Sequence, residues 1–158
     1  MAALAGPFAT VGATADIHTA VANVVGQRAH DAAGNEYIYL KGVASLAAGD
    51  WVCYDELGVT IRALVATVGP VAIAQAAVTA VTSFGWFLIR GTGLANVASG
   101  FADNATLNGT ATPGVADDNL VATEAESQIF GAWGRSAVSG SQATVQIQYP
   151  YKSLAVLD

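Results

Sequence analysis

Charged residues are scarce in this chain of 158 residues. Asp, Glu, Lys and Arg together make up 11% of the sequence, against about 25% in an ordinary soluble domain. The hydrophobic fraction is 53%, so much of the surface is apolar or weakly polar. Because contiguous apolar surface on a soluble protein usually ends in an interface, this composition favours a protein that works through contacts with partners.

Basic residues are particularly few. Six Lys and Arg residues stand against twelve Asp and Glu residues, which gives a net charge of -6. Nucleic-acid binders concentrate basic side chains in a stripe that neutralises phosphates. Here the basic residues are scattered along the chain, at Arg28, Lys41, Arg62, Arg90, Arg135 and Lys152. The sequence therefore predicts no direct binding to nucleic acid.

Thiol and imidazole groups are almost absent as well. Cys53 is the only cysteine, which excludes an intrachain disulfide and a cysteine-built zinc site. Its neighbours Trp51 and Val52 indicate a buried apolar position. His18 and His30 are the only histidines, and no carboxylate accompanies them at metal-ligand spacing. We predict no metal site and no cofactor, and we expect both imidazoles to be solvated.

One run of residues is free of charge and long enough to cross a membrane, but absence of charge is its only feature typical of a membrane span. Residues 63–89 contain no charged side chain, but Gly69, Pro70 and Gly85 interrupt them. We interpret the run as strands and turns, and predict no membrane partner. The first fourteen residues lack a basic segment, and Gly and Pro break their apolar stretch, unlike a secretory signal. We expect synthesis in a cytoplasm.

Catalytic motifs are missing from the sequence. It contains no nucleophile elbow, P-loop, zincin motif or dinucleotide-binding motif. Asp117 and Asp118 are adjacent, so on an extended chain their side chains point to opposite sides, and we interpret them as a solvated turn. Residues 91–93 are interpreted as a turn too, because no third glycine or helix follows. We predict that the protein is not an enzyme.

The chain does contain a succession of short segments typical of β-strands. β-branched and aromatic residues are punctuated by Gly, Asp and Pro, at the spacing of β-sandwiches and barrels. The predicted strands are residues 36–40, 51–54, 59–64, 71–74, 75–81, 86–91, 128–131, 132–138 and 143–149, with 86–91 central and short edge strands and loops over 91–119. We predict an all-β fold, a single compact β-sandwich or barrel-like domain of short antiparallel strands.

The most regular of these segments is residues 143–149. Its strict alternation places Val145 and Ile147 on one face of a strand, and Gln146 and Gln148 on the other. This pattern predicts a half-buried strand.

The first thirty residues are small and weakly patterned. Residues 20–25 could form a strand, but such a segment often orders only against a neighbour, because alone it buries too little apolar area. We divide the chain into an extended N-terminal arm, residues 1–30, ordered on assembly, and a β-rich domain, residues 31–158. The predicted interface residues are apolar side chains of the arm: Phe8, Val11, Ile17 and Val21.

Three tryptophans, Trp51, Trp86 and Trp133, could together line a sugar site. Each stands in an apolar strand or beside glycine, where packing in the core is the commoner fate of tryptophan. We predict core positions for them and keep a carbohydrate-binding β module as an alternative function.

Six segments follow one another in a specific order along residues 36–150. They are EYIYLKG (36–42), LAAGDWV (46–52), GPVAIA (69–74), FGWFLIRG (84–91), TATPGVADD (110–118) and ATVQIQYP (143–150). Their order resembles that of the capsid decoration, or cement, proteins of tailed bacteriophages. In that family a Gly-Asp turn, a G-V-A strand, an F/Y-G-W strand and a T-A-x-x-G-V hairpin succeed one another.

The resemblance implies a structural virion protein, made in the host cytoplasm, that forms a homotrimer on the outer surface of an icosahedral capsid. There it would bridge major capsid subunits and stabilise the shell, so its partners would be the major capsid protein and itself. Low charge suits closely approached interfaces, and the acidic excess suits a position away from DNA. Another virion component, such as a head fibre base or a tail protein, is the alternative within this class.

Overall fold

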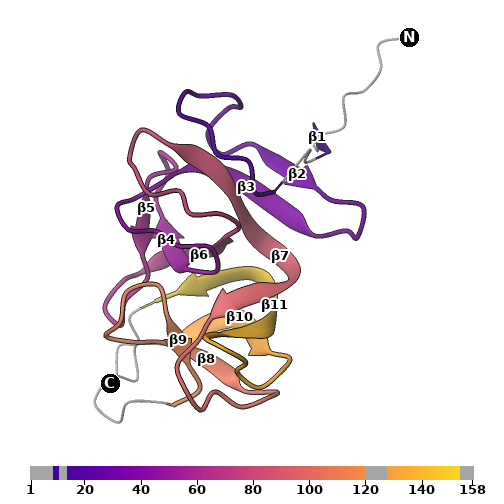
Figure 1. The fold of residues 1–158 in the computed structure, drawn as a ribbon, viewed down its shortest axis with the longest axis vertical. Coiled ribbons are helices and arrows are strands. Elements are labelled where there is room, and N and C mark those ends of the chain that lie inside the picture. Colours follow the sequence, from indigo (N-terminus) through magenta and orange to yellow (C-terminus); the bar gives the residue numbers. More distant parts are fainter. Residues whose placement is uncertain (1–8, 11–13, 120–127, 154–158) are drawn as a thin grey trace.

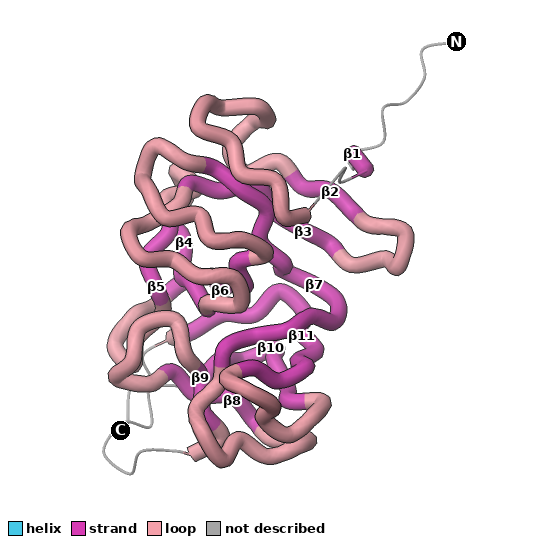
Figure 2. Tube along the Cα trace, viewed as in Figure 1, coloured by secondary structure: helices cyan, strands magenta, loops and turns pink. Residues whose placement is uncertain are grey.

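The computed structural model describes residues 9–10, 14–119 and 128–153, and these form an all-β fold (Figure 1). Strands joined by loops and turns make up all of the described chain, with no helix (Figure 2). The predicted all-β class is confirmed. Within these residues no helix is long and apolar enough to cross a membrane.

The described strands number eleven and belong to one sheet. Their bounds are β1 Ala9–Thr10, β2 Arg28–His30, β3 Glu36–Lys41, β4 Trp51–Tyr54, β5 Thr60–Arg62, β6 Gly69–Ala74, β7 Phe84–Asn96, β8 Thr106–Gly109, β9 Ala116–Asp117, β10 Gln128–Gly134 and β11 Gln142–Lys152.

The strand order is β1-β2-β3-β7-β6-β11-β10-β8-β9, with β4 paired to β6 and β5 paired to β4. Every pairing is antiparallel except that of β1 with β2. The sheet is not closed into a barrel. In Figure 1, β2 to β6 occupy the upper part of the molecule and β8 to β11 the lower part, while β7 runs through both.

Strand β7 is the central element of the sheet. Its first part pairs with β3 and β6, and its second part, from Arg90 to Asn96, pairs with β11. Gly91 lies between the two parts with a φ of +117°, a value that strongly favours glycine. A Cβ at Gly91 would also collide with the Asn35 side chain. The turn predicted at residues 91–93 is therefore wrong, because the glycines bend the strand without ending it.

Apolar side chains fill both faces of the sheet in its upper part. Tyr39 and Trp51 belong to one core cluster, whereas their sequence neighbours Leu40 and Val52 belong to a second cluster on the opposite face. Such alternation follows from the two-residue period of a strand. Burying each large side chain contributes about 1.5–3 kcal/mol. Two filled faces therefore stabilise the sheet from both sides.

The predictions for the large core residues are mostly confirmed. Trp51, Trp86 and Cys53 are buried, and in β11 Val145 and Ile147 are buried while Gln146 and Gln148 are exposed.

Trp133 departs from the prediction because it is 41% exposed. It lies on β10 next to Ala132, whose side chain is buried, and opposite the exposed Gln146 of β11. Successive side chains of a strand point to opposite faces, so a buried Ala132 places Trp133 outward.

Two predicted strands are not formed. Residues 75–81 are loop, and Val78 there is fully buried against the second core cluster while its backbone bonds to Ala76 and Val43. The β-branched composition thus reflects burial of a loop and not pairing in a sheet. Residues 20–25 are also irregular, and the nearest strand is β2, which begins at Arg28.

Candidate functional site

Ionisable side chains do not gather in a catalytic or metal-binding arrangement in the part of the chain that the structure describes. No group of three or more His, Cys, Asp and Glu side chains in residues 9–10, 14–119 and 128–153 is placed to hold a metal ion. Asp117 ends β9 and accepts a hydrogen bond from the backbone N–H of Asp118 at 2.8 Å. Asp118 in turn accepts one from the N–H of Ala102 at 2.8 Å. The pair is half-buried and satisfies loop backbone groups, so the expected solvated turn is only partly right.

The two histidines are half-buried, contrary to the expectation that they are solvated. The Nδ1 atom of His18 lies 3.0 Å from the hydroxyl of Tyr39, and the backbone of His18 pairs with that of Phe84. His30 is a residue of β2. His18 therefore helps to attach its segment to the sheet.

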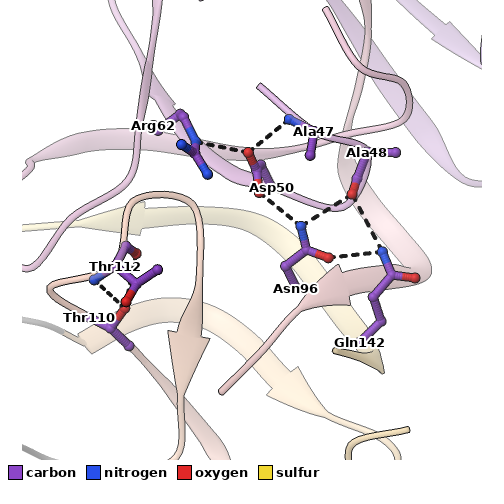
Figure 3. A network of polar contacts seen from close by, with 8 residues as sticks. All are labelled: Ala47, Ala48, Asp50, Arg62, Asn96, Thr110, Thr112 and Gln142. Atoms are coloured by element: carbon purple, nitrogen blue, oxygen red, sulfur yellow. Dashed lines mark hydrogen bonds and ion pairs between the residues drawn. The ribbon is translucent and has the colours of Figure 1, made fainter. Parts of the chain in front are cut away.

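The most extensive buried polar network surrounds Asp50, which is 1% exposed (Figure 3). One carboxylate oxygen of Asp50 accepts hydrogen bonds from the N–H of Ala47 and from Nε of Arg62, both at 2.9 Å. The other oxygen accepts one from Nδ2 of Asn96 at 2.8 Å. Gln142 donates to Oδ1 of Asn96 at 2.9 Å. The network joins β5, β7 and β11 to the turn at residues 45–50.

The loop at residues 110–115 closes this network. Trp51 N donates to the carbonyl of Gly114 at 3.0 Å, and Gly114 N donates to the carbonyl of Ala63 at 2.8 Å. Gly114 has a φ of +78°, and a Cβ there would lie 2.6 Å from Cγ of Asp50. Buried charges need partners of this kind to offset their desolvation. The network is therefore part of the framework.

The described part of the predicted arm, residues 14–30, lies against the sheet and exposes apolar side chains. His18 and Phe84 exchange two backbone hydrogen bonds, at 2.9 and 2.8 Å, and Gly26 N donates to the carbonyl of Tyr39 at 2.8 Å. Between these two attachments, the exposed fractions are 60% for Val21 and 73% for Val24, and Ile17 beside the first attachment is 44% exposed. We call Ile17, Val21 and Val24 the N-terminal surface.

The predicted interface residues are divided by the structure. Ile17 and Val21 are exposed on the N-terminal surface, whereas Phe8 and Val11 lie outside the described residues. Val24 was missed, although it continues the spaced apolar residues of the same segment. The division of the chain at residue 30 stays a prediction, and β2 within the arm pairs with β3.

A second candidate site is an open cavity of about 590 Å³, located where the ends of β2, β4, β6 and β11 meet. It is rich in tyrosine and proline and is called the tyrosine pocket below. Its lining residues are Arg28, Tyr54, Gly69, Pro70, Tyr149, Pro150, Tyr151 and Lys152. A neighbouring hollow shares Tyr54 and Pro70 with it and extends to Val68, which is 49% exposed.

The Tyr149 ring is held in the tyrosine pocket by two charged residues. Its hydroxyl donates a hydrogen bond to Oε2 of Glu36 at 2.5 Å, and Glu36 is only 2% exposed. Nη1 of Arg28 donates to Oε1 of Glu36 at 3.3 Å. The guanidinium carbon of Arg28 also lies 5.5 Å from the centre of the Tyr149 ring, within the range of a cation–π interaction.

Two tyrosines of the pocket, Tyr149 and Tyr54, have raised pKa values. The hydrogen bond to Glu36 raises the pKa of Tyr149, and burial adds to this shift. Burial also raises the pKa of Tyr54, an effect that the nearby Arg28 charge reduces. Both phenols are therefore neutral at neutral pH, so the Tyr54 hydroxyl can donate and accept hydrogen bonds, whereas the Tyr149 hydroxyl donates its proton to Glu36.

The position of Tyr149 follows from an irregularity between β10 and β11. Phe130 pairs with Tyr151 and Ala132 pairs with Ile147, so three residues of β11 face Gly131 alone. Tyr149 has a φ of +46°, and Gly131 has a φ of +75° and would place a Cβ 2.8 Å from the carbonyl oxygen of Gln148. Bulges of this type re-aim side chains. This bulge directs Tyr149 into the tyrosine pocket.

The same bulge lets β11 change its neighbour. Gln148 is the last residue of β11 that pairs with β7, and Tyr151 is the first that pairs with β6. The Tyr151 ring stacks on that of Phe130, with centroids 5.2 Å apart and an interplanar angle of 20°. Both exposed tyrosine rings of the pocket therefore have a fixed support.

Lys152 forms part of the pocket wall although its side chain is buried. Its Nζ donates to the carbonyls of Leu64 and Val65, at 2.6 and 3.2 Å. These bonds attach the end of β11 to the loop that follows β5.

Comparison with known proteins does not add to this description. No family model matches the chain, and no curated protein or solved structure matches it.

Proposed function

We propose that the protein is a structural virion protein that binds the outer surface of an icosahedral phage capsid and stabilises the shell by bridging major capsid subunits. The observation that carries this proposal is the N-terminal surface. Its segment is attached by backbone hydrogen bonds to β3 and β7, yet it turns Ile17, Val21 and Val24 to solvent. Full burial of an exposed side chain of this kind contributes about 1.5–3 kcal/mol, and these three, which are 44–73% exposed, would each contribute part of that on a partner.

The resemblance to capsid decoration proteins supports the proposal because the resembling segments form the framework of the fold. Each of the six resembling segments supplies a strand or a turn: β3, the turn into β4, β6, β7, the loop leading to β9, and β11. Asp50, Trp51 and Gly114 of these segments are buried, Trp51 N donates to the carbonyl of Gly114, and Gly114 lies against the Asp50 side chain. The shared motifs thus account for the scaffold, and the surface that contacts a capsid lies outside them.

Charge and assembly fit the same proposal. A net charge of -6 suits the exterior of a DNA-filled shell, where no phosphate has to be neutralised. A homotrimer, which the resemblance implies, would share apolar surface between copies before the trimer meets the major capsid protein.

The test is to mix the purified protein with shells that lack it, pellet the particles and measure bound copies by gel densitometry. We expect saturable binding in a fixed ratio to the major capsid protein. The double variant Ile17→Asp/Val21→Asp should bind at least about tenfold more weakly, because two charges would have to be desolvated in the contact. Leu94→Asp is the matched control, since Leu94 is 58% exposed on β7 and belongs to neither surface.

Each result has a distinct meaning. Absence of binding by the unaltered protein would refute a capsid role. Equal binding of the double variant and the control would show that the N-terminal surface is not the contact. Melting temperatures of all three proteins establish whether the substitutions leave the fold intact.

A further inference from the structure

We infer that the tyrosine pocket is a binding site for a neutral saccharide, a function separate from attachment through the N-terminal surface. The pocket combines exposed aromatic rings with polar groups that can bind hydroxyls. Its volume of about 590 Å³ is within the usual range for small-ligand sites, roughly 300–1,000 Å³. It therefore has room for a short saccharide.

Two rings in the pocket are exposed and already oriented. Tyr149 is 46% exposed and Tyr151 is 51% exposed. Glu36 and Arg28 hold the first ring, and Phe130 supports the second. Aromatic rings present large apolar faces, against which the C–H face of a pyranose can pack. Because the rings are held before binding, little side-chain entropy is lost when a ligand arrives.

The polar groups beside the rings match the hydroxyls of a sugar. The Arg28 side chain is 48% exposed, and its guanidinium has five N–H groups, of which Nη1 supplies one to Glu36. The remaining donors of Arg28 and the neutral hydroxyl of Tyr54 can bind sugar oxygens.

A neutral sugar suits this site better than an acidic one. The carboxylate of Glu36 compensates the charge of Arg28, the Nζ of Lys152 is buried against the carbonyls of Leu64 and Val65, and the whole chain carries a net charge of -6. An anionic ligand would therefore gain little attraction in the pocket.

The backbone indicates that the direction of Tyr149 matters. A non-glycine residue in the left-handed region costs about 1–3 kcal/mol when the surroundings must enforce it, and such residues cluster at ligand sites. Tyr149 has this conformation within the bulge, at a φ of +46°.

A peptide fits the pocket less well than a saccharide does. An extended peptide bound at a strand end needs backbone N–H groups to pair with. Pro70 and Pro150 line the pocket and have no N–H group. The pocket wall therefore offers rings and few backbone donors.

The experiment applies the full chain to an array of neutral oligosaccharides, then titrates the methyl glycoside of the best terminal sugar by calorimetry and saturation-transfer NMR. We expect binding at millimolar or lower concentration, with the sugar C–H protons closest to the protein. Tyr149→Ala and Tyr151→Ala should each weaken binding by about tenfold or more, since stacking on one ring contributes about 1.4 kcal/mol. Tyr149→Phe should keep most of the binding because the ring remains.

Trp133→Ala is the matched control, because Trp133 is 41% exposed on β10 and does not line the pocket. It should change saccharide binding by less than about twofold. Absence of binding to every neutral saccharide would overturn the inference. So would loss of binding only in Trp133→Ala, or binding of a polyproline peptide without any saccharide.

The capsid and saccharide functions can fail independently. Tyr149→Ala should bind shells as the unaltered protein does, whereas Ile17→Asp/Val21→Asp should bind the saccharide normally. Loss of saccharide binding in the Ile17→Asp/Val21→Asp variant, with its fold intact, would contradict the assignment to the tyrosine pocket.

Discussion

Two buried carboxylates in this molecule have similar partners and different surroundings. Asp50 and Glu36 are 1% and 2% exposed, and each accepts a hydrogen bond from an arginine, at 2.9 Å from Arg62 and 3.3 Å from Arg28. The remaining partners of Asp50 are the backbone of Ala47 and the amide of Asn96. Among the described residues, the other partner of Glu36 is the hydroxyl of a half-exposed ring, Tyr149.

The difference shows that the location of the partners decides what a buried carboxylate does. Charges removed from water require hydrogen bonds in return, so both carboxylates organise their neighbours. Around Asp50 those neighbours are interior loops and strands, and the result is a fixed framework. Around Glu36 they reach the surface, and the result is a positioned aromatic side chain.

Removing the enclosed carboxylate should have the largest effect on stability. Asp50→Ala removes the acceptor of Arg62 and of the N–H of Ala47, and one of the two acceptors of the Asn96 amide, so the free energy of unfolding should fall by about 3 kcal/mol. Urea denaturation measures the change. Asp55→Ala is the control, because Asp55 is exposed and caps two backbone N–H groups, and it should cost about 1 kcal/mol. Equal losses of unfolding free energy in the two variants would show that the buried Asp50 stabilises the fold no more than the exposed Asp55 does.

Removing the second carboxylate should cost less. Glu36→Ala should lower the free energy of unfolding by about 2 kcal/mol, because the half-exposed Arg28 can be solvated by water when its partner is lost. The same denaturation experiment applies. A loss as large as that of Asp50→Ala would mean that Glu36 is also mainly a framework residue.

Removing only the hydroxyl of the ring should have a smaller effect. Tyr149→Phe deletes the hydrogen bond to Glu36 and should lower the free energy of unfolding by about 1 kcal/mol. In a double-mutant cycle with Glu36→Ala, the two losses should not add, because both substitutions break the same bond. Additive losses would show that the bond contributes nothing to the folded state.

The smallest expected effect is a change in alkaline titration. The Glu36 hydrogen bond and burial raise the pKa of Tyr149 above its ordinary value, so Glu36→Gln should shift this pKa back towards that of a free tyrosine. The difference in ultraviolet absorbance between wild type and Tyr149→Phe, followed as the pH rises, isolates the titration of Tyr149. Its neutral form adds stability below the ordinary pKa of tyrosine, and that contribution is lost as pH rises through the higher folded value. An unchanged titration in Glu36→Gln would refute the coupling.

Tyr37 provides an internal reference for that titration. Burial, together with a 2.8 Å hydrogen bond donated to Asp31, raises the pKa of Tyr37 from 10.0 to about 12. Its contribution to stability is full below pH 10 and is lost as pH rises through about 12. This group should titrate equally in wild type and in Glu36→Gln.

Local patterns were sufficient to predict the strands that end in clear turns. Residues 36–40 and 51–54 combine β-branched or aromatic side chains with Gly, Asn or Asp near their ends, residues 143–149 alternate apolar and polar side chains, and each forms part of a strand. Where these signals serve another purpose, prediction fails. Val78 fills a core from a loop, and Gly91 bends a strand that continues to Asn96.

The tyrosine pocket could not be predicted from local patterns. Tyr149 and Glu36 are 113 positions apart, and they meet because β11 and β3 both pair with β7. A contact at such a separation depends on the register of three strands. The adjacent Tyr149, Pro150 and Tyr151 were the available signal of an aromatic surface.

The pairing of β11 with β6, β7 and β10 has a consequence for synthesis on the ribosome. The later part of β7 and the start of β6 gain a hydrogen-bonding neighbour only after residue 152 has left the exit tunnel. Until then, these strand edges are open to other nascent chains. Sheets made from such distant segments also form slowly, because a long loop must close first. Chaperone contact at this stage should therefore raise the yield of folded protein.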